Sequence, residues 1–466
     1  MLFRSNIGGE WKSPCEFVED LNEYYTKTSD STTMEFPQLF HNNMRASLST
    51  KVALGDVINR LKSLNTRKAS HSEDFPQWLS KNNAHAIATP LHHIIECMLA
   101  CKEFPAIWKR SEITPINKVA SPDELKDFRP IALTYHCSKI AESYIVKILN
   151  VDFADSTQYA YSKGIGTTDA LVRAVTTWKK AMDDKSTLAV HALFEDFSKA
   201  FDNMRPDILA KVMSSQGYNP AIIQLCISYL TDRTQCVIYK PTRVRSSERK
   251  CSVGVPQGTI CGPTLWNIFI RSLETNESIL KYADDLTIHT TIPKSAARTV
   301  KQGEKTTSGS TINQAAEASQ NWCSQHGMTL NTTKTKHMLI TLRDKIQLDE
   351  PVLINREEIQ RVQQFKLLGV ILDEHLNFHA HIDSIIERSQ MKHYALLLLK
   401  RYGVNAHGLR NYYASIIRSL LTYACAAWYP SASKTDRDSL EGIQKRCLKT
   451  IYPHIEHYED RLAAAN

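Results

Sequence analysis

The 466-residue chain contains no apolar run that approaches the ~20 residues needed for a helix to cross a bilayer. Its first residues, Met1 to Asn6, also lack the apolar stretch of a secretory signal. Both absences argue against a membrane protein and a secreted one. We therefore expect an intracellular protein of the nucleus or cytoplasm, with no membrane partner.

The cysteines do not form a framework for disulfides or zinc. The eleven residues are scattered from Cys15 to Cys447, and none of them forms a Cys-x-x-Cys pair. His93, Cys97 and Cys101 recur at helical spacing, but a second pair of ligands is missing, so a zinc site is not favoured there. We expect reduced, mostly buried thiols and no small-molecule redox cofactor.

The chain also lacks low-complexity tracts and internal repeats at spacings of roughly 20–50 residues, which argues against a solenoid. Its composition, with 42% hydrophobic and 23% charged residues, is that of an ordinary folded protein. A chain longer than about 250–300 residues usually divides into domains, so we expect two or three lobes. The formal net charge of +8 suits a polyanionic partner without proving one.

The first feature that points to chemistry is the pair Asp284-Asp285 in Tyr282-Ala-Asp-Asp. It lies at the expected tip of a strand–turn–strand that begins at Ser278. Two adjacent like charges are costly unless a cation neutralises them, and magnesium binds one or two carboxylates while it keeps several waters. The tetrapeptide suggests a metal site, although a solvated acidic turn is the favoured explanation when the tetrapeptide is considered alone.

Two further motifs precede this pair in the sequence. The apolar, β-rich stretch from Thr187 to Phe194 predicts a buried strand, and Asp196 stands at its end. A Gly-, Pro- and Gln-containing turn from Gly254 to Pro263 then leads into a predicted helix. The order is thus an aspartate that closes a strand, a turn before a helix, and an acidic hairpin.

In this order the chain resembles the reverse transcriptases of non-LTR (LINE-type) retrotransposons of the jockey and CR1 kind. The resemblance is carried by DFSKAFD at Asp196–Asp202, GVPQGTICGPTLWNIFI from Gly254, YADD from Tyr282, and RPIALT from Arg129. It covers roughly residues 50–450. The first three of these are ordered, independent motifs, and together they make a chance match very improbable.

The resemblance implies an α+β fold of the right-hand polymerase kind, with fingers, a palm made of an antiparallel sheet and helices, and a helical thumb. We expect residues 1–50 to be a polar lead-in or linker with a short helix near Pro14–Tyr25. Fingers and palm would occupy residues 51–375, and the thumb residues 376–466. The stretch from Phe365 to Asp373 resembles the strand pair that closes the palm in this family.

The resemblance also implies an RNA-directed DNA polymerase. Such an enzyme extends a primer 3′-hydroxyl with dNTPs on an RNA template by two-metal nucleotidyl transfer, with Mg²⁺ as the expected ion and Mn²⁺ as an alternative. Asp196 and Asp284 match the family's metal ligands, and Asp285 is the supporting acid. Asp285 is the less certain ligand because adjacent residues of a strand face opposite ways.

Six residues match positions that contact the nucleotide in this family. Phe201 matches the ring beneath the sugar that disfavours a 2′-hydroxyl, and Asp202 is expected to fix the turn. Gln257 and Gly258 are expected to contact the incoming nucleotide and the template, and Lys118 and Arg129 the triphosphate. Lys334 is a possible proton donor to the leaving pyrophosphate. Each alone also fits a core ring, a turn amide or a solvated cation.

Contacts to the RNA template and the primer or target DNA are less specific in the sequence. Basic residues crowd a predicted hairpin, and others lie off the apolar stripe of the last long helix, where they could follow a phosphate backbone. A solvated face explains such charges as well. The candidates are Lys240, Arg243, Arg245, Lys445 and Lys449.

Some positions depart from the family. Lys68–Asp74 stands where a loop rich in glycine and proline is usual, which affects the expected fingertip contact with template. Glu195 replaces an apolar residue, and a buried charge there costs stability unless it is paired. We also expect no endonuclease, because only about 50 residues precede the polymerase region.

Two alternatives remain open. The chain could be a decayed or co-opted element copy that binds RNA without synthesis. It could also be another palm polymerase, such as a group II intron maturase or a telomerase, but the residues of the motifs resemble those of the jockey kind and argue against that.

Overall fold

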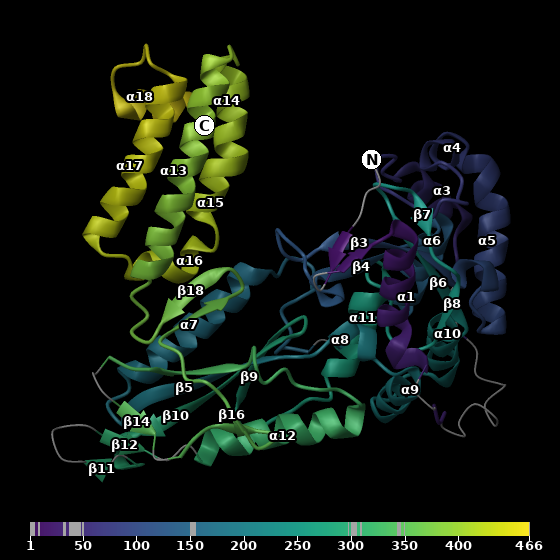
Figure 1. Cartoon of the computed structure of the whole chain (residues 1–466), viewed down its shortest axis with the longest axis horizontal. Coiled ribbons are helices and arrows are strands. Elements are labelled where there is room, and N and C mark those ends of the chain that lie inside the picture. The colour runs from purple at the N-terminus through teal and green to yellow at the C-terminus, as the bar shows by residue number, and fades with distance from the viewer. Residues whose placement is uncertain are drawn as a thin grey trace. The chain divides into compact units, whose positions relative to one another are not determined.

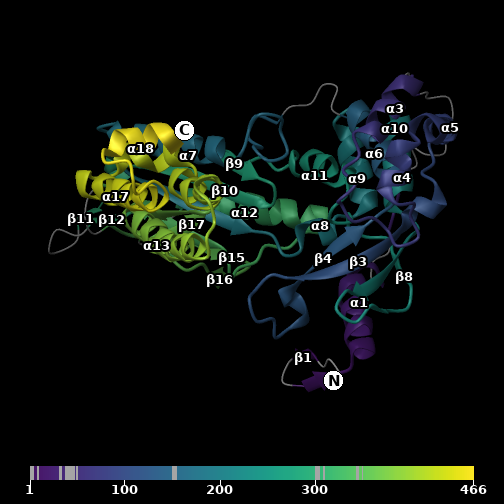
Figure 2. The same ribbon diagram turned by 90° about the horizontal axis from the view of Figure 1, so that it is seen from above.

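The computed structural model forms two compact units, each with its own sheet (Figures 1 and 2). Unit 1 comprises Met1–Ser156, Phe197–Glu274 and Asn321–Thr329, and unit 2 comprises Thr157–Asp196, Thr275–Gln320 and Leu330–Asn466. The boundaries of these units do not coincide with the expected boundaries of fingers, palm and thumb. The division into fingers, palm and thumb therefore stays a prediction. The structure describes residues 5–7, 10–30, 34–36, 48, 51–149, 155–296, 298–299, 305–307, 310–342, 346–348 and 350–465.

Unit 1 is built around a sheet in the order β4-β3-β6-β7, with β8 also paired to β6. The pair β3–β6 is parallel, and the other pairs are antiparallel. The strands are β3 (Arg110–Asn117), β4 (Phe128–Leu133), β6 (Arg233–Tyr239), β7 (Val244–Arg245) and β8 (Arg249–Cys251).

The helices of unit 1 bury their apolar sides around this sheet. They are α1 (Pro14–Asp30), α3 (Leu54–Lys62), α4 (Gln77–Asn82), α5 (Ala84–Cys101), α6 (His136–Leu149), α8 (Ala200–Asn203), α9 (Pro206–Ser215), α10 (Pro220–Leu230) and α11 (Cys261–Ile270). Short 3₁₀ turns lie at Ala106–Lys109 and Leu125–Asp127, and an N-terminal strand pair at β1 (Ser5–Ile7) and β2 (Glu10–Lys12).

Helix α1 belongs to the core of unit 1. Phe17, Val18 and Leu21 share a face at helical spacing and pack in one apolar cluster with Ile113 and Val237 of the sheet. The expected short helix is present and longer than expected. Because its apolar face is buried, the expected description as a polar lead-in does not hold for Pro14–Asp30.

Unit 2 contains an antiparallel four-stranded sheet in the order β13-β5-β10-β9. The strands are β5 (Thr187–Asp196), β9 (Ser278–Tyr282), β10 (Asp285–Pro293) and β13 (Lys336–Ile340). Helix α7 (Thr167–Asp183) covers one face, where Trp178 contacts Phe194. Ser319 of α12 (Ser310–His326) lies on the other face beside Glu195. Because both faces are covered, β5 is buried along nearly its whole length.

The C-terminal helices share a core with this sheet. Val190 and Phe194 of β5 belong to the same apolar cluster as Ile382 and Ile443 of the long helices, and α13 packs along α17 (Figures 1 and 2). The elements are β17 (Gln364–Leu367), β18 (Val370–Asp373), α13 (His379–Arg401), α14 (Ala406–Tyr412), a π-helical turn at Tyr413–Arg418, α15 (Ser419–Thr422), α16 (Cys425–Trp428), α17 (Lys434–Ile451) and α18 (Tyr458–Ala465).

The remaining elements of unit 2 are short. They are 3₁₀ turns at Lys294–Ala296 and Tyr429–Ser431, and the strands β11 (Arg298–Thr299), β12 (Lys305–Thr307), β14 (Ile346–Leu348), β15 (Leu353–Ile354) and β16 (Glu357–Glu358). The expected α+β class with an antiparallel sheet is confirmed. None of the helices in the described ranges is long and apolar enough to span a bilayer.

Candidate active site

The acidic hairpin has the expected form. Strands β9 and β10 pair in an antiparallel register that sets Tyr282 opposite Asp285, which leaves Ala283 and Asp284 as a two-residue turn. Ala283 has a φ of 56°, a left-handed conformation that non-glycine residues seldom adopt. Something outside the hairpin must therefore stabilise this turn.

The stabilising group is the side chain of Gln158. Its Oε1 accepts hydrogen bonds from the backbone N–H groups of Ala283 (3.0 Å) and Ala160 (2.9 Å), and its Nε2 donates to the Ala283 carbonyl (3.4 Å). Gln158 is 5% exposed. It was not identified from the sequence, because its partner lies 125 residues further along the chain.

We expect Gln158→Ala to loosen the acidic turn. The change leaves the N–H groups of Ala283 and Ala160 without these partners, which costs about 1–3 kcal/mol for each buried group that stays unpaired. A misplaced turn should also lower the rate of any reaction at the carboxylates by roughly 10²-fold. Thermal melting and kcat measure the two effects.

The matched control is Gln390→Ala, an exposed glutamine of α13 in the same unit. Adding Ala283→Gly to the Gln158→Ala variant should recover part of both losses, because glycine adopts positive φ without strain. Equal behaviour of Gln158→Ala and Gln390→Ala would show that Gln158 does not hold the turn.

The carboxylates of Asp196 and Asp285 meet across the sheet. Asp196 is the last residue of β5 and Asp285 the first of β10, and the register pairs them directly. Directly opposed residues point to the same face with Cβ atoms about 4.5–5.5 Å apart. Asp284 adjoins them in the turn. The structure thus gathers all three predicted acids at one end of the sheet in unit 2.

Lys334 joins this group from the segment before β13. Its Nζ lies 3.2 Å from Oδ2 of Asp196, although two thirds of the lysine side chain is exposed. The backbone also ties the segment down, because the Asn331 N–H donates to the Asp196 carbonyl (2.8 Å). A lysine cation therefore stands against the acids in this structure.

The electrostatics of the acids are those of crowded like charges. The pKa of the Asp285 carboxyl is raised to about 6, first by loss of hydration and then by repulsion from Asp284 and Asp196, while Lys334 opposes the shift. The residue remains open to solvent. A divalent cation would remove the repulsion.

A cavity of about 230 Å³ opens beside the acids. It is lined by Phe194, Glu195, Asp196, Asp285, Leu286, Lys334, Phe365 and Leu367. Its polar groups are carboxylates and one lysine, and hard oxygen donors are the ligands that Mg²⁺ prefers. The donor chemistry thus fits magnesium. Among the described residues, however, no three His, Cys, Asp or Glu side chains are already gathered as ligands of one ion.

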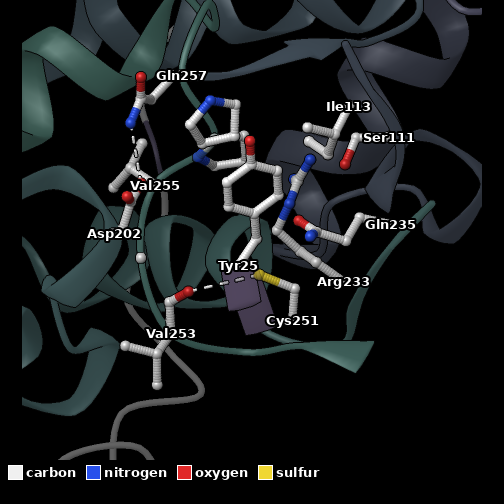
Figure 3. Close-up of a pocket in the computed structure, with 13 residues that line it drawn as sticks. Tyr25, Ser111, Ile113, Asp202, Arg233, Gln235, Cys251, Val253, Val255 and Gln257 are labelled. Atoms are coloured by element: carbon white, nitrogen blue, oxygen red, sulfur yellow. Dashed lines mark hydrogen bonds between the residues drawn. The ribbon is translucent and has the colours of Figure 1, made fainter. Parts of the chain in front are cut away.

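A second set of predicted residues lies in unit 1 (Figure 3). The Gln257 Nε2 donates to Oδ1 of Asp202 (3.0 Å), and the Gln257 carbonyl accepts from the Ala132 N–H (2.8 Å). Asp202 therefore fixes the turn, as expected. Gly258 has a φ of 103°, and a Cβ there would lie 3.3 Å from the Ala132 carbonyl oxygen. Backbone conformation thus requires the glycine.

The turn is also joined to the segment around Phe201. The Val255 N–H donates to the Phe201 carbonyl (2.8 Å), and a Cβ on Gly254 would lie 2.6 Å from the Asp202 carbonyl oxygen. The half-buried Phe201 ring packs against Trp266 of α11, with ring centroids 5.2 Å apart. The structure thus brings Phe201, Gln257 and Gly258 together.

Glu142 of α6 anchors the other end of this turn. Its buried Oε2 accepts hydrogen bonds from the N–H groups of Ile260 (2.7 Å) and Cys261 (3.1 Å), at the N-terminus of α11. A carboxylate is favourable there because helix N-terminal N–H groups lack intrahelical partners. Burial still raises the pKa of Glu142. The sequence around Glu142 gives no sign of this role, because the two N–H groups that it accepts from lie 118 and 119 residues further along the chain.

Lys118 and Arg129 lie on the β3–β4 hairpin of unit 1, both exposed. Arg129 pairs with Ile116 in the register, and the Lys118 Nζ donates to the Lys126 carbonyl (2.6 Å). Their assignment as triphosphate ligands stays a prediction.

The basic candidates for nucleic-acid contact differ in their surroundings. Lys240 and Arg243 are exposed, whereas Arg245 forms an ion pair with the buried Glu112 (3.7 Å). Arg245 is therefore already engaged. Lys445 and Lys449 are exposed on α17, opposite its buried apolar stripe, and the Lys445 ammonium lies over the Tyr458 ring.

The loop that departs from the family is held by polar contacts. His71 is buried and stacks on Tyr135, with ring centroids 4.4 Å apart. The Ser72 N–H donates to Glu112 (2.8 Å), and Asp74 accepts from the His136 N–H (2.7 Å). These side chains replace the glycines and prolines as the means of fixing the loop.

Comparison with known proteins agrees with these motifs. Residues 116–372 match the family model described as reverse transcriptase (RNA-dependent DNA polymerase). The chain is 25% identical over 460 residues to the probable RNA-directed DNA polymerase from transposon BS of Drosophila melanogaster, which covers 92% of this chain and 47% of that protein. It is 27% identical over 368 residues to the RNA-directed DNA polymerase from mobile element jockey of the same organism, with 77% and 39% covered.

The chain thus spans about half of these relatives' length or less. Among solved structures, apo telomerase from Candida Tropicalis matches with a TM-score of 0.44 and 14% identity, covering 82% of this chain and 66% of that one. The family match extends over more than half of the chain and contains all three motifs. The chain therefore belongs to the reverse transcriptase family and is of its non-LTR, LINE-type kind.

Proposed function

We propose that this chain is an RNA-directed DNA polymerase that adds dNTPs to a primer 3′-hydroxyl with the help of two Mg²⁺ ions. The observation that carries the proposal is the direct pairing of Asp196 with Asp285 beside Asp284, at the mouth of a cavity. Reverse transcriptases generally use divalent metal ions. Mn²⁺ has the same preference for oxygen ligands and is the alternative ion.

Asp196, Asp284 and Asp285 would hold the metal. When bound, such ions lower the pKa of the attacking hydroxyl and neutralise charge on the leaving pyrophosphate. Because the pKa of Asp285 is about 6, its carboxyl would have to lose a proton on loading at lower pH, so loading should weaken as the pH falls below about 6. Lys334 would exchange its contact with Asp196 for one with phosphate, close enough to protonate the pyrophosphate.

Unit 1 would supply the contacts to the nucleotide. Phe201 would exclude a 2′-hydroxyl by its bulk, while Gln257 and Gly258 would lie against base and template. Arg129 can grip phosphate oxygens bidentately, and Lys118 acts as a point charge. RNA template and DNA primer would follow the exposed cations Lys240, Arg243, Lys445 and Lys449, with a smaller part for Arg245, which is already paired to Glu112.

Primer extension on poly(rA)/oligo(dT) tests the proposal. We expect dTTP incorporation that requires Mg²⁺ and stops with EDTA, and a rate that falls below pH 6 as Asp285 becomes protonated. Binding of the same primed RNA is measured in parallel by fluorescence anisotropy. A folded protein that binds the RNA in a salt-dependent way but incorporates no dTTP would instead support the co-opted RNA-binding relic.

A further inference from the structure

Helix α1 precedes the region that matches the family model, yet it is firmly docked in unit 1. The Asn22 Nδ2 donates to the Ser246 Oγ (3.0 Å), and the Gln235 Nε2 donates to the Asn22 Oδ1 (3.1 Å), both away from solvent. Buried hydrogen bonds of this kind fix one orientation of a helix as well as its attachment. The face of α1 that carries Tyr24 and Tyr25 is thereby held in place.

That face contacts the turn that carries Phe201. Lys199, the residue immediately before α8, has a φ of 51° and a ψ of 49°, a left-handed conformation that is strained for a non-glycine residue. The Lys199 ammonium lies 3.7 Å from the centre of the Tyr24 ring. A cation over an aromatic face is attracted to the ring, and this attraction opposes the strain at Lys199.

Tyr25 reaches the other end of the same turn (Figure 3). Its ring lines a cavity of about 40 Å³ together with Asp202, Gln257 and Arg233. Its hydroxyl is buried and has no hydrogen-bond partner in the described structure, and the same holds for the Arg233 Nη2. Burial, and then the charge of Asp202, raise the pKa of Tyr25. The Tyr25 hydroxyl therefore stays neutral, and the ring lies in the cavity that Asp202 and Gln257 also line.

We propose that Tyr24 and Tyr25 are positioning residues for nucleotide selection, because they hold the turn from Lys199 to Asp202 at both ends. This inference rests on the proposed polymerase function. On its other side the turn is joined to the Gly254–Gln257 segment, through the Val255 N–H bond to the Phe201 carbonyl and the Gln257–Asp202 pair. If it moves, Phe201 and Gln257 move with it, and the discrimination between dNTP and rNTP weakens.

The test measures incorporation of dTTP and of UTP on poly(rA)/oligo(dT) with full-length protein. We expect Tyr24→Leu to raise the KM for dTTP about fivefold and to reduce the dTTP-to-UTP ratio of kcat/KM about tenfold, with kcat for dTTP within twofold of the wild type. Tyr24→Phe keeps the aromatic face and should behave as wild type. Lys199→Met removes the cation from the same contact and should reproduce Tyr24→Leu.

Tyr25→Phe and Tyr25→Ala separate the hydroxyl from the ring. The hydroxyl has no partner, so Tyr25→Phe should match the wild type, whereas Tyr25→Ala should lose selectivity as Tyr24→Leu does. Cys15→Ser, at an exposed position of α1, is the matched control. Thermal melting of every variant separates a shifted turn from a lost fold, and Lys199→Met tests the contact even if Tyr24→Leu does not fold.

Three results would overturn the inference. An unchanged KM and selectivity in both Tyr24→Leu and Lys199→Met would show that the contact has no role in selection. An equal fall of kcat with both nucleotides, tracking a lower Tm, would leave only a structural role. A wild-type protein that incorporates nothing would remove the polymerase function and this inference with it, whereas the first two results leave that function intact.

Discussion

Asp196→Asn and Asp285→Asn should each abolish Mg²⁺-dependent synthesis without unfolding the protein. Each change removes one charged oxygen ligand from the paired carboxylates while keeping the size of the side chain. We expect incorporation to fall at least roughly 10³-fold, which corresponds to about 4 kcal/mol of transition-state stabilisation. Primer extension with dTTP measures the loss.

Although Asp285→Asn should abolish synthesis, it should raise the stability of the folded protein. Its pKa of about 6 in the folded protein lies above the value of 3.8 for a free side chain, so its charge destabilises the fold. This penalty is absent below pH 4, grows as the pH rises, and is complete above about pH 6. Asp285→Asn should therefore melt at a higher temperature than the wild type at pH 8 and at the same temperature at pH 4.

Asp383→Asn is the matched control, because Asp383 is an exposed aspartate of α13 in the same unit. It should change neither synthesis nor the melting temperature. A wild-type rate in Asp285→Asn would show that the direct cross-strand pair is not the metal site, and Asp196 with Asp284 would then be the remaining candidates.

The local patterns of the sequence predicted the elements that carry the site. The apolar run that ends at Asp196 is β5, the acidic hairpin is β9 and β10, and the turn at Gln257 leads into α11. Each depends on neighbouring residues: a continuous apolar stretch, a two-residue turn, and glycines where φ is positive. Such signals lie within about ten residues of one another and can be read from one chain.

Contacts between distant segments were not predictable in the same way. From the sequence, Asp284 is the expected ligand and Asp285 the supporting acid, because adjacent residues of a strand face opposite ways. The sequence did not show that the β5–β10 register pairs Asp285 with Asp196 across the sheet. Register depends on pairing between strands far apart in sequence, and a shift of one residue would reverse it. Gln158 and Glu142 were missed for the same reason, since a polar residue shows its partner only in the folded chain.

Replacing Glu195 by leucine should stabilise the protein strongly at alkaline pH. Glu195 is 3% exposed, stands opposite Leu286 in the sheet, and neither of its carboxyl oxygens has a well-formed hydrogen bond in the described structure. Burial raises its pKa to about 8, and the nearby Ser319 opposes this only in part. The burial of Glu195 and its lack of a charged partner among the described residues thus agree with the sequence-based expectation that a charge at this position costs stability.

The sign of the pH dependence follows from the two pKa values. An unfolded glutamate has a pKa of 4.5, so between pH 4.5 and about 8 the folded protein must keep a proton that the unfolded chain releases. The wild type should lose about 1.4 kcal/mol of stability per pH unit across this window, on the order of 3–5 kcal/mol in all. Glu195→Leu should not show this loss, and urea unfolding from pH 5 to 9 measures the difference.

Glu317→Leu is the matched control, an exposed glutamate on α12 near the same face. It should leave the slope of stability against pH unchanged. Because Glu195 points away from the face of Asp196, Glu195→Leu should retain synthesis. A parallel pH dependence in Glu195→Leu and the wild type would mean that the carboxylate is already neutralised by a partner. A loss of synthesis in a stable Glu195→Leu protein would mean that the proton it holds is used at the neighbouring site.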